Sequence, residues 1–209
     1  LAVGDAAGHG IPAALMGTWA HAGFRDRARR GTMPGHLLTA LNLDLVALNQ
    51  PDVFVALLCA RVDVRAATLT YANAGLTPPL LRRRDGRCET LRQSGVLLGV
   101  TAAARYEDTC VELDAGDVVV LYSDGLTEAR RGESDFGLAG LQRVLEAHAR
   151  QGAEEILRAL LAEVQAFADQ PLDDITVVVL KQLTRPARLP AGVSQGELKL
   201  EAGIADTTR

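Results

Sequence analysis

Residues 113–130 read LDAGDVVVLYSDGLTEAR, and this stretch decides the fold. A turn at residues 115–117 leads into an unbroken apolar run at 118–122, which is typical of a strand buried on both faces. The run then meets Asp124 and Gly125, a dipeptide that commonly forms a turn. The stretch therefore predicts a buried strand that holds a carboxylate where it ends.

The same arrangement occurs at two other places in the chain. LAVGD at 1–5 is interpreted as the end of a buried strand, with Asp5 ahead of the glycine-rich AAGHG, and Asp173 and Asp174 precede the apolar ITVVVL. Carboxylates at three strand ends would form an oxygen-rich pocket, which suits hard cations such as Mg²⁺ or Mn²⁺. Each Asp alone could simply cap a turn, but the recurrence beside three apolar strands favours a metal site.

Two helices are expected near the start of the chain. The first should begin near Pro12, a residue favoured in the first turn, and GTMPG at 31–35 should end it. Its expected apolar face consists of Ile11, Ala14, Leu15, Thr18 and Ala22. The second helix should span 36–49, and its apolar stripe consists of Leu38, Leu41, Leu45 and Leu48.

From Val53 the pattern changes to strands, and Asp85-Gly86 is a strong signal for a hairpin turn. The expected strands lie within 53–63, 67–75, 79–84, 88–93, 106–114, 118–122 and 175–183. Helical patterns return at about 137–149 and 153–168. Hairpins imply antiparallel sheets, so this order predicts an α+β fold, a sandwich of sheets covered by helices.

Residues 1–183 are expected to form one domain. After Thr184 the composition shifts, and Pro186, Pro190 and Gly192 indicate a linker. ELKLEAG at 197–203 then alternates like a new strand. We therefore expect 184–209 to be a linker and the start of a second domain, which weakly resembles the opening of GHKL-type ATPase domains. A disordered tail is the alternative left open.

The bulk composition limits the partners. The chain has 209 residues, a net charge of −4 and a pI near 5.6, values that argue against nucleic acid or direct insertion into an anionic membrane. No apolar run approaches the ~20 residues that a membrane span needs. Arginines gather at 25–30 and 82–87, either as solvated ends of elements or as a docking patch for an acidic partner.

Three cysteines, Cys59, Cys88 and Cys110, are widely spaced. Without a CxxC or Cys/His cluster, neither a disulfide framework nor a zinc site is indicated. Reduced thiols in a cytoplasmic protein are the expected state.

Four blocks of the sequence carry a family resemblance: VGDAAGHGIPAALMG at 3–17, YANAGLTPPLLRR at 71–83, LDAGDVVVLYSDGLTEAR at 113–130 followed by FG, and DDITVVVL at 173–180. In this order they resemble the signature blocks of the SpoIIE-like (RsbU-type) phosphatases, part of the PPM or 2C-like serine/threonine phosphatases. The resemblance covers about residues 1–182.

This resemblance implies a four-layer α/β/β/α sandwich of two antiparallel sheets and a hydrolase with two Mn²⁺ or Mg²⁺ ions. Metal-bound water would hydrolyse phosphoserine or phosphothreonine on a regulatory protein, of the anti-anti-sigma type, in bacterial signal transduction and sigma factor regulation. A homodimer is left open.

The resemblance also implies roles for single residues. Asp5 is expected to bridge both metals, the carbonyl of Ala6 to be a further ligand, and Asp124 and Asp173 to be the other ligands. Asp174 stands where related enzymes often have Asn. It is expected to hold the ligand residues in place without binding a metal itself.

The loop residues of these blocks have supporting roles. Gly8 and Gly10 are expected to let the loop approach the metals without a Cβ, and Gly125 forms the turn after Asp124. His9 could contact the phosphate or merely cap the helix.

The chain departs from the family pattern at two points. The family has a GGDxxD strand just upstream of this first block, so we expect the chain to lack its first strands and one ligand. Leu76 also stands where family members usually have His.

Two other functions are weighed. A catalytically inactive phosphatase-fold sensor or scaffold would usually have lost metal-binding acids, but Asp5, Asp124 and Asp173 are all present. A dinucleotide-binding loop is disfavoured, because the glycine spacing does not fit GxGxxG and hairpins follow it.

Overall fold

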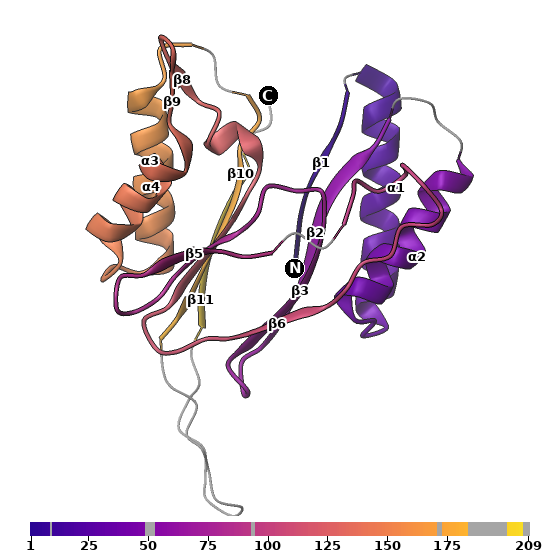
Figure 1. The fold of residues 1–209 in the computed structure, drawn as a ribbon, viewed down its shortest axis with the longest axis horizontal. Helices are drawn as coiled ribbons and strands as arrows, with labels where there is room; N and C mark the ends of the chain where they lie inside the picture. Colours follow the sequence, from indigo (N-terminus) through magenta and orange to yellow (C-terminus); the bar gives the residue numbers. More distant parts are fainter. Residues whose placement is uncertain (9, 49–52, 93–94, 171–172, 184–199, 207–209) are drawn as a thin grey trace, which may run out of the picture. The chain divides into compact units, whose positions relative to one another are not determined.

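The computed structural model describes residues 1–8, 10–48, 53–92, 95–170, 173–183 and 200–206. The chain divides into two compact units (Figure 1). Unit 1 comprises Leu1–Val62, Leu69–Pro78 and Arg92–Val111, and unit 2 comprises Asp63–Thr68, Pro79–Leu91 and Glu112–Arg209. Each unit has its own antiparallel sheet and its own pair of helices, so the α+β class expected from the sequence is confirmed.

Unit 1 is built on a four-stranded sheet in the order β1-β2-β3-β6. Its elements are β1 (Ala2–Ala6), α1 (Gly10–Arg29), α2 (Pro34–Ala47), β2 (Val55–Asp63), β3 (Thr68–Ala74) and β6 (Thr109–Glu112). At the edge, β1 pairs antiparallel with β2, with Asp5 opposite Ala56. A Cβ on Gly4 would lie 2.9 Å from the backbone carbonyl oxygen of Ala56, so the close pairing of these two strands favours glycine.

The second helix of unit 1 buries the face that its sequence pattern indicates. Leu38, Leu41 and Leu45 of α2 are almost fully buried, and Leu48 is half-buried. They pack in one cluster with Met16 and Ala20 of α1 and with residues of β2 and β3. Pro34 begins α2, a position where its missing N–H costs nothing. The prediction for this helix is confirmed.

The prediction for the face of α1 is wrong. Ile11 and Leu15, expected in the core, are 77% and 57% exposed, and Trp19 on the same side is 56% exposed. The buried residues of α1 are Ala13, Met16 and Ala20. The side chains on this side are mostly small, so the helix can lie close to the sheet. A Cβ on Gly17 of α1 would lie 3.9 Å from Cβ of Ala6 in β1. The strand before α1 also differs from expectation, because only Val3 of β1 is buried.

Unit 2 is built on a five-stranded sheet in the order β11-β10-β7-β4-β5, and β8-β9 is a separate ribbon. Its elements are β4 (Leu80–Arg82), β5 (Cys88–Thr90), β7 (Val118–Tyr122), the 3₁₀ turn η1 (Asp124–Leu126), β8 (Arg130–Arg131), β9 (Ser134–Asp135), α3 (Gly137–His148), α4 (Ala153–Phe167), β10 (Thr176–Gln182) and β11 (Leu200–Asp206). The expected hairpin forms at Asp85-Gly86, where Gly86 has a φ of 97°.

The core of unit 2 lies between its sheet and its helices. All five residues of β7 are buried, as the apolar run predicts. Apolar side chains of α3 and α4 pack against β7 and β10, among them Leu141, Leu145, Ile156, Leu160 and Val164. Glu155 closes the start of α4 by accepting a hydrogen bond from the Gly152 amide at 2.7 Å.

The strand β11 pairs antiparallel with β10 over seven positions, from Thr176 opposite Asp206 to Gln182 opposite Leu200. Residues 200–206 therefore extend the sheet of unit 2, and the second domain expected to begin within 184–209 stays a prediction. The expected linker with Pro186, Pro190 and Gly192 lies outside the described residues, and its assignment stays a prediction.

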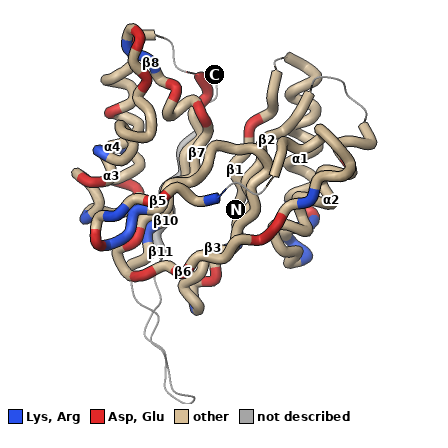
Figure 2. Tube along the Cα trace, in the orientation of Figure 1, with Lys and Arg blue, Asp and Glu red and all other residues tan. Residues whose placement is uncertain are grey.

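Figure 2 shows where basic and acidic residues lie along the chain, and several of the clustered arginines pair with acids. Arg27 pairs with Asp44, Arg30 with Asp26, and Arg87 with Asp85. Arg83 contacts both Glu89 and the buried Asp117. These pairs favour solvated ends of elements over a docking patch.

Cys59, Cys88 and Cys110 are free thiols, as expected. In the part of the chain that the structure describes, none of the helices has the length and apolar character needed to cross a bilayer.

Candidate functional site

The first acidic turn follows β7. The backbone carbonyl of Asp124 accepts hydrogen bonds from the amides of Thr127 and Glu128, both at 2.8 Å, which closes η1. Its side chain is exposed, and Oδ1 accepts a bond from the Gly125 amide at 2.9 Å. The carboxylate is thus fixed by its own turn while it remains open to solvent.

The second acidic turn precedes β10. Because β10 runs antiparallel to β7, with Val177 opposite Tyr122, the start of β10 lies beside the end of β7. Asp173 and Asp174 are exposed, and Oδ1 of Asp173 accepts the Asp174 amide at 2.8 Å. The sheet register therefore brings both acidic turns to one edge of unit 2.

Gly125 is where the two turns touch. A Cβ at this position would lie 2.4 Å from the carbonyl oxygen of Asp174 and 3.5 Å from the carbonyl carbon of Asp173. A side chain would therefore collide with backbone that cannot rotate away. This contact gives a physical reason for glycine at position 125, and its membership of a metal site stays a prediction.

The FG segment that follows the third block, Phe136-Gly137, anchors the chain after Asp124. The amide of Gly137 donates to the carbonyl of Thr127 at 2.9 Å, and Gly137 has a φ of 62°, which favours glycine. The neighbouring Phe136 is buried, and its amide donates to the carbonyl of Ala129 at 2.8 Å. These bonds fold residues 127–137 back onto the base of the first acidic turn.

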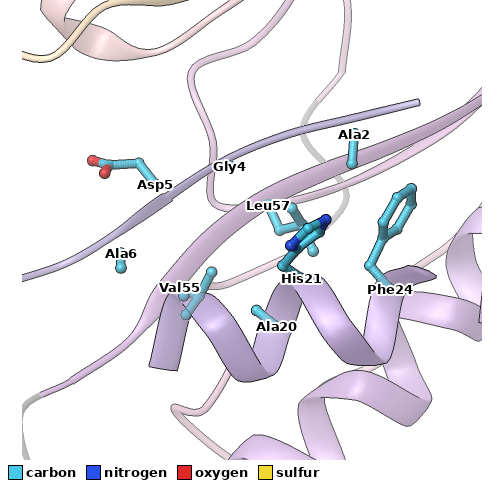
Figure 3. A pocket seen from close by; sticks show the side chains of 10 residues that line it. Ala2, Gly4, Asp5, Ala6, Ala20, His21, Phe24, Val55 and Leu57 are labelled. Carbon is cyan, nitrogen blue, oxygen red and sulfur yellow. The ribbon is translucent and has the colours of Figure 1, made fainter. Parts of the chain in front are cut away.

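Asp5 and Ala6 lie in unit 1, on opposite faces of β1. Figure 3 shows the carboxylate of Asp5 on the side of β1 away from α1, whereas Ala6 faces the helix. Between β1 and α1 lies a cavity of about 290 Å³ with a largely apolar lining that includes His21, Phe24 and Leu57. Asp5 is one of the lining residues, but its carboxylate points away from α1, so the cavity is not a carboxylate pocket.

The glycine loop after β1 has unusual backbone angles. Gly8 and Gly10 have φ values of 104° and 77°, a region that residues with a Cβ rarely adopt. No neighbouring atom lies within 4 Å of a Cβ built at either glycine in unit 1. Glycine is therefore favoured here by the backbone conformation, and the expected close approach of the loop to metal ions stays a prediction. His9 lies outside the described residues.

Leu76 is buried, and Asn73 holds it in place. The side chain of Asn73 accepts the Leu76 amide at 2.8 Å and donates to the Leu76 carbonyl at 3.0 Å. This block of the sequence thus forms a closed turn inside unit 1, and Leu76 offers no group to a site. Sequence reasoning did not single out Asn73; a buried polar residue inside YANAG was the available signal.

The structure thus brings Asp124, Gly125, Asp173 and Asp174 together in unit 2, while Asp5, Ala6, Gly8 and Gly10 lie in unit 1. Among the described residues, no group of three or more His, Cys, Asp or Glu is gathered closely enough to hold a metal ion. The donors at the paired turns are nevertheless carboxylate oxygens that face solvent. Mg²⁺ commonly binds through one or two carboxylates and keeps several waters, so Asp124 and Asp173 fit such an ion.

Comparison with known proteins places this site in a family. The pattern of the family described as Stage II sporulation protein E (SpoIIE) matches residues 1–182. Phosphoserine phosphatase RsbU of Bacillus subtilis is 28% identical over 184 residues, which are 87% of this chain and 55% of RsbU. Protein IcfG of Synechocystis is 27% identical over 67% of this chain and 23% of IcfG. The chain therefore spans about half of the first relative's length, and less of the second's.

Solved structures agree with the fold. The SiaA-PP2C domain of Pseudomonas aeruginosa matches with a TM-score of 0.72 and 26% identity, over 85% of this chain and 73% of that one. The structure of the RsbU and RsbW domains of Rv1364c from Mycobacterium tuberculosis matches with a TM-score of 0.71 and 22% identity, over 88% of this chain and 51% of that one. These likenesses confirm the fold of PP2C-type phosphatases.

Proposed function

Because the chain belongs to the SpoIIE family, we propose that it is a metal-dependent protein serine/threonine phosphatase. The observation that carries this proposal is the contact between the two acidic turns at Gly125. It places two solvent-facing carboxylates of the matched region on adjacent turns. A catalytically inactive member of the fold would have no need to keep both acids at this edge.

In this proposal the acids hold two Mn²⁺ or Mg²⁺ ions. The proposed ligands in unit 2 are Asp124 and Asp173, and the proposed ligands in unit 1 are Asp5 and the carbonyl of Ala6. Bound divalent ions would activate water and neutralise the charge of the phosphoryl group. The chain contributes rigid placement, because Asp124 and Asp173 each have one carboxylate oxygen that accepts a hydrogen bond from a backbone amide of its own turn.

The proposed substrate is phosphoserine or phosphothreonine on a regulatory protein of the anti-anti-sigma type, in a cytoplasmic signalling circuit. Support comes from the names of relatives: RsbU and RsbP of Bacillus subtilis are both called phosphoserine phosphatases. A solved relative carries an RsbU and an RsbW domain in one chain. Hydrolysis of a phosphoserine peptide in preference to free phosphoserine would support a protein substrate.

The test is hydrolysis of p-nitrophenyl phosphate with Mn²⁺, with Mg²⁺ and with excess EDTA. Asp124→Asn and Asp173→Asn should each lower kcat by about two orders of magnitude, because each removes a charged ligand. Asp135→Asn is the matched control, since Asp135 is an exposed acid of the same unit that pairs with Arg130. Activity that survives EDTA would contradict metal dependence.

The alternative function is an inactive sensor or scaffold with the same fold. The observation in its favour is the buried Leu76, which stands where the family usually has His. This alternative predicts no turnover with any divalent ion, and no difference between Asp124→Asn and Asp135→Asn.

A further inference from the structure

Ser123 lies between the two acidic turns and bonds to both sides of their contact. It is 4% exposed and directly precedes Asp124. Its hydroxyl donates to the carbonyl of Asp174 at 3.2 Å and accepts a hydrogen bond from the Thr176 amide at 3.0 Å. The hydroxyl thus acts as donor and acceptor at once; Asp174 belongs to the turn that carries Asp173, and Thr176 begins β10.

The backbone explains why a hydroxyl is needed here. The amide of Ser123 continues the β7–β10 pairing by donating to the carbonyl of Thr176 at 3.0 Å. A regular antiparallel ladder would return the Thr176 amide to the carbonyl of Ser123. That carbonyl instead accepts the amide of Leu126 at 3.3 Å, because the chain turns into η1. The side chain of Ser123 therefore replaces its own carbonyl as the partner of Thr176.

This replacement lets β7 leave the ladder and present Asp124 while the start of β10 stays attached. Gly125 packs against the same carbonyl of Asp174 that Ser123 binds. Glycine thus sets how closely the turns approach, and the serine hydroxyl keeps them from separating. On the basis of the proposed function, we propose that Ser123 is a positioning residue that fixes the spacing of the Asp124 and Asp173 carboxylates for divalent ions.

The experiment compares Ser123→Ala with two variants that keep a polar group. Ser123→Thr retains the hydroxyl, and Ser123→Cys retains the size with a weaker donor and acceptor. Thr127→Ala is the matched control: its hydroxyl bonds to the carbonyl of Asp124 at 3.2 Å without reaching the second turn. Hydrogen exchange of the Thr176 amide reports the bond itself, and calorimetric titration with Mn²⁺ reports the ion site.

Ser123→Ala should speed exchange at Thr176 and weaken Mn²⁺ binding by about 10- to 100-fold, the usual effect of losing a group that orients a metal ligand. Ser123→Thr and Thr127→Ala should bind Mn²⁺ within about threefold of the unchanged protein, since both keep the link between the turns. The Mn²⁺ affinity of Ser123→Cys should lie between those of Ser123→Ala and Ser123→Thr. Ser123→Cys replaces Ser123→Ala in the experiment if the alanine variant does not fold.

Two results would overturn the inference in distinguishable ways. If Ser123→Ala, or Ser123→Cys in its place, exchanges faster at Thr176 but binds Mn²⁺ like the unchanged protein, the positioning role is wrong and the proposed function stands. If the unchanged protein binds no Mn²⁺ or Mg²⁺, the proposed function fails and the positioning role fails with it.

Discussion

Arg131 contacts Phe167 with both its charge and its hydrogen-bond donors. The guanidinium lies 4.7 Å from the ring centroid of Phe167, and Nε donates to the Phe167 carbonyl at 2.7 Å. A second nitrogen donates to the carbonyl of Ala166 at 2.6 Å. The last carbonyls of a helix lack partners inside it, so Arg131 caps α4. The Phe167 ring also packs edge-on against Phe136, with ring centroids 5.6 Å apart. This contact links the cap to the FG segment that follows the first acidic turn.

Arg131→Ala should destabilise unit 2 by about 1–2 kcal/mol, because it removes two bonds to helix carbonyls and a cation–π contact. The neighbouring Arg130 forms an ion pair with Asp135, and both side chains are more than half exposed. Arg130→Ala should therefore cost less than about 0.5 kcal/mol. Urea unfolding of both variants is the measurement, and equal losses would show that the cap contributes nothing beyond an ordinary surface pair.

Gly125→Ala should force the acidic turns apart, because the added Cβ meets the Asp174 carbonyl oxygen at 2.4 Å. The free energy of unfolding should fall by about 1–3 kcal/mol. The variant should also lose the increase in melting temperature that Mn²⁺ gives the unchanged protein. Gly17→Ala is the opposite control: its Cβ has only Ala6 nearby, at 3.9 Å, inside a helix where alanine is favoured by about 1 kcal/mol. Thermal melts with and without Mn²⁺ distinguish the two. An unchanged Gly125→Ala melt would mean that the turns are not in contact.

A chain that ends after residue 183 should melt at lower temperature than the full chain. It loses the seven-position pairing of β11 with β10 and leaves β10 as an open edge, which also favours aggregation. Each kcal/mol lost lowers the Tm of a domain of this size by about 2–4 °C. A chain that ends after Asp206 keeps the pairing and is the control. Equal melting temperatures for the 183 truncation and the full chain would instead support a linker followed by a separate domain.

The protein should lose stability at alkaline pH. Burial raises the pKa of the Cys59 thiol from 9.0 to about 11, and burial raises the pKa of Tyr122 from 10.0 to about 12. The folded state keeps protons that the unfolded chain releases, so the free energy of unfolding is undiminished below pH 9 and falls as pH rises toward 11. For Cys59 the total fall is about 3 kcal/mol.

Urea midpoints at several pH values between 8 and 11 would measure this fall. Cys59→Ala removes the thiol and should flatten the curve between pH 9 and 10, leaving the fall above pH 10 that Tyr106 and Tyr122 cause, since burial raises the pKa of both from 10.0 to about 12. A curve with the same slope in both proteins would show that Cys59 is not the group responsible.

The sequence predicts most elements of the fold because their signals are local. The run at 118–122 and the turn at Asp85-Gly86 each specify their structure within a few residues, and both form as expected. The face of α1 could not be predicted in this way. Residues 10–24 contain no Asp, Glu, Lys or Arg, so no polar side sets the phase of the helix. Both sides are apolar, and close packing selects the smaller one.

The paired acidic turns were predictable only in part. Asp124 and Asp173 stand out because each is an acid at the end of an apolar strand. Their closeness depends on the antiparallel register of β7 and β10. Ser123 was missed because a serine before an Asp-Gly turn is common, and its two bonds are to residues 51 and 53 positions away. Such long-range partners leave no trace in spacing or composition.

The exposed position of Trp19 determines what fluorescence can report about this protein. Trp19 is the chain's single tryptophan, and it lies on the open side of α1 in unit 1. Emission excited selectively from tryptophan therefore comes from a largely hydrated indole even in the native state, and it changes little when distant parts unfold. The tryptophan emission would respond strongly to the binding of a ligand or protein over this side of α1. A melt followed by this emission describes one helix, whereas circular dichroism follows both units.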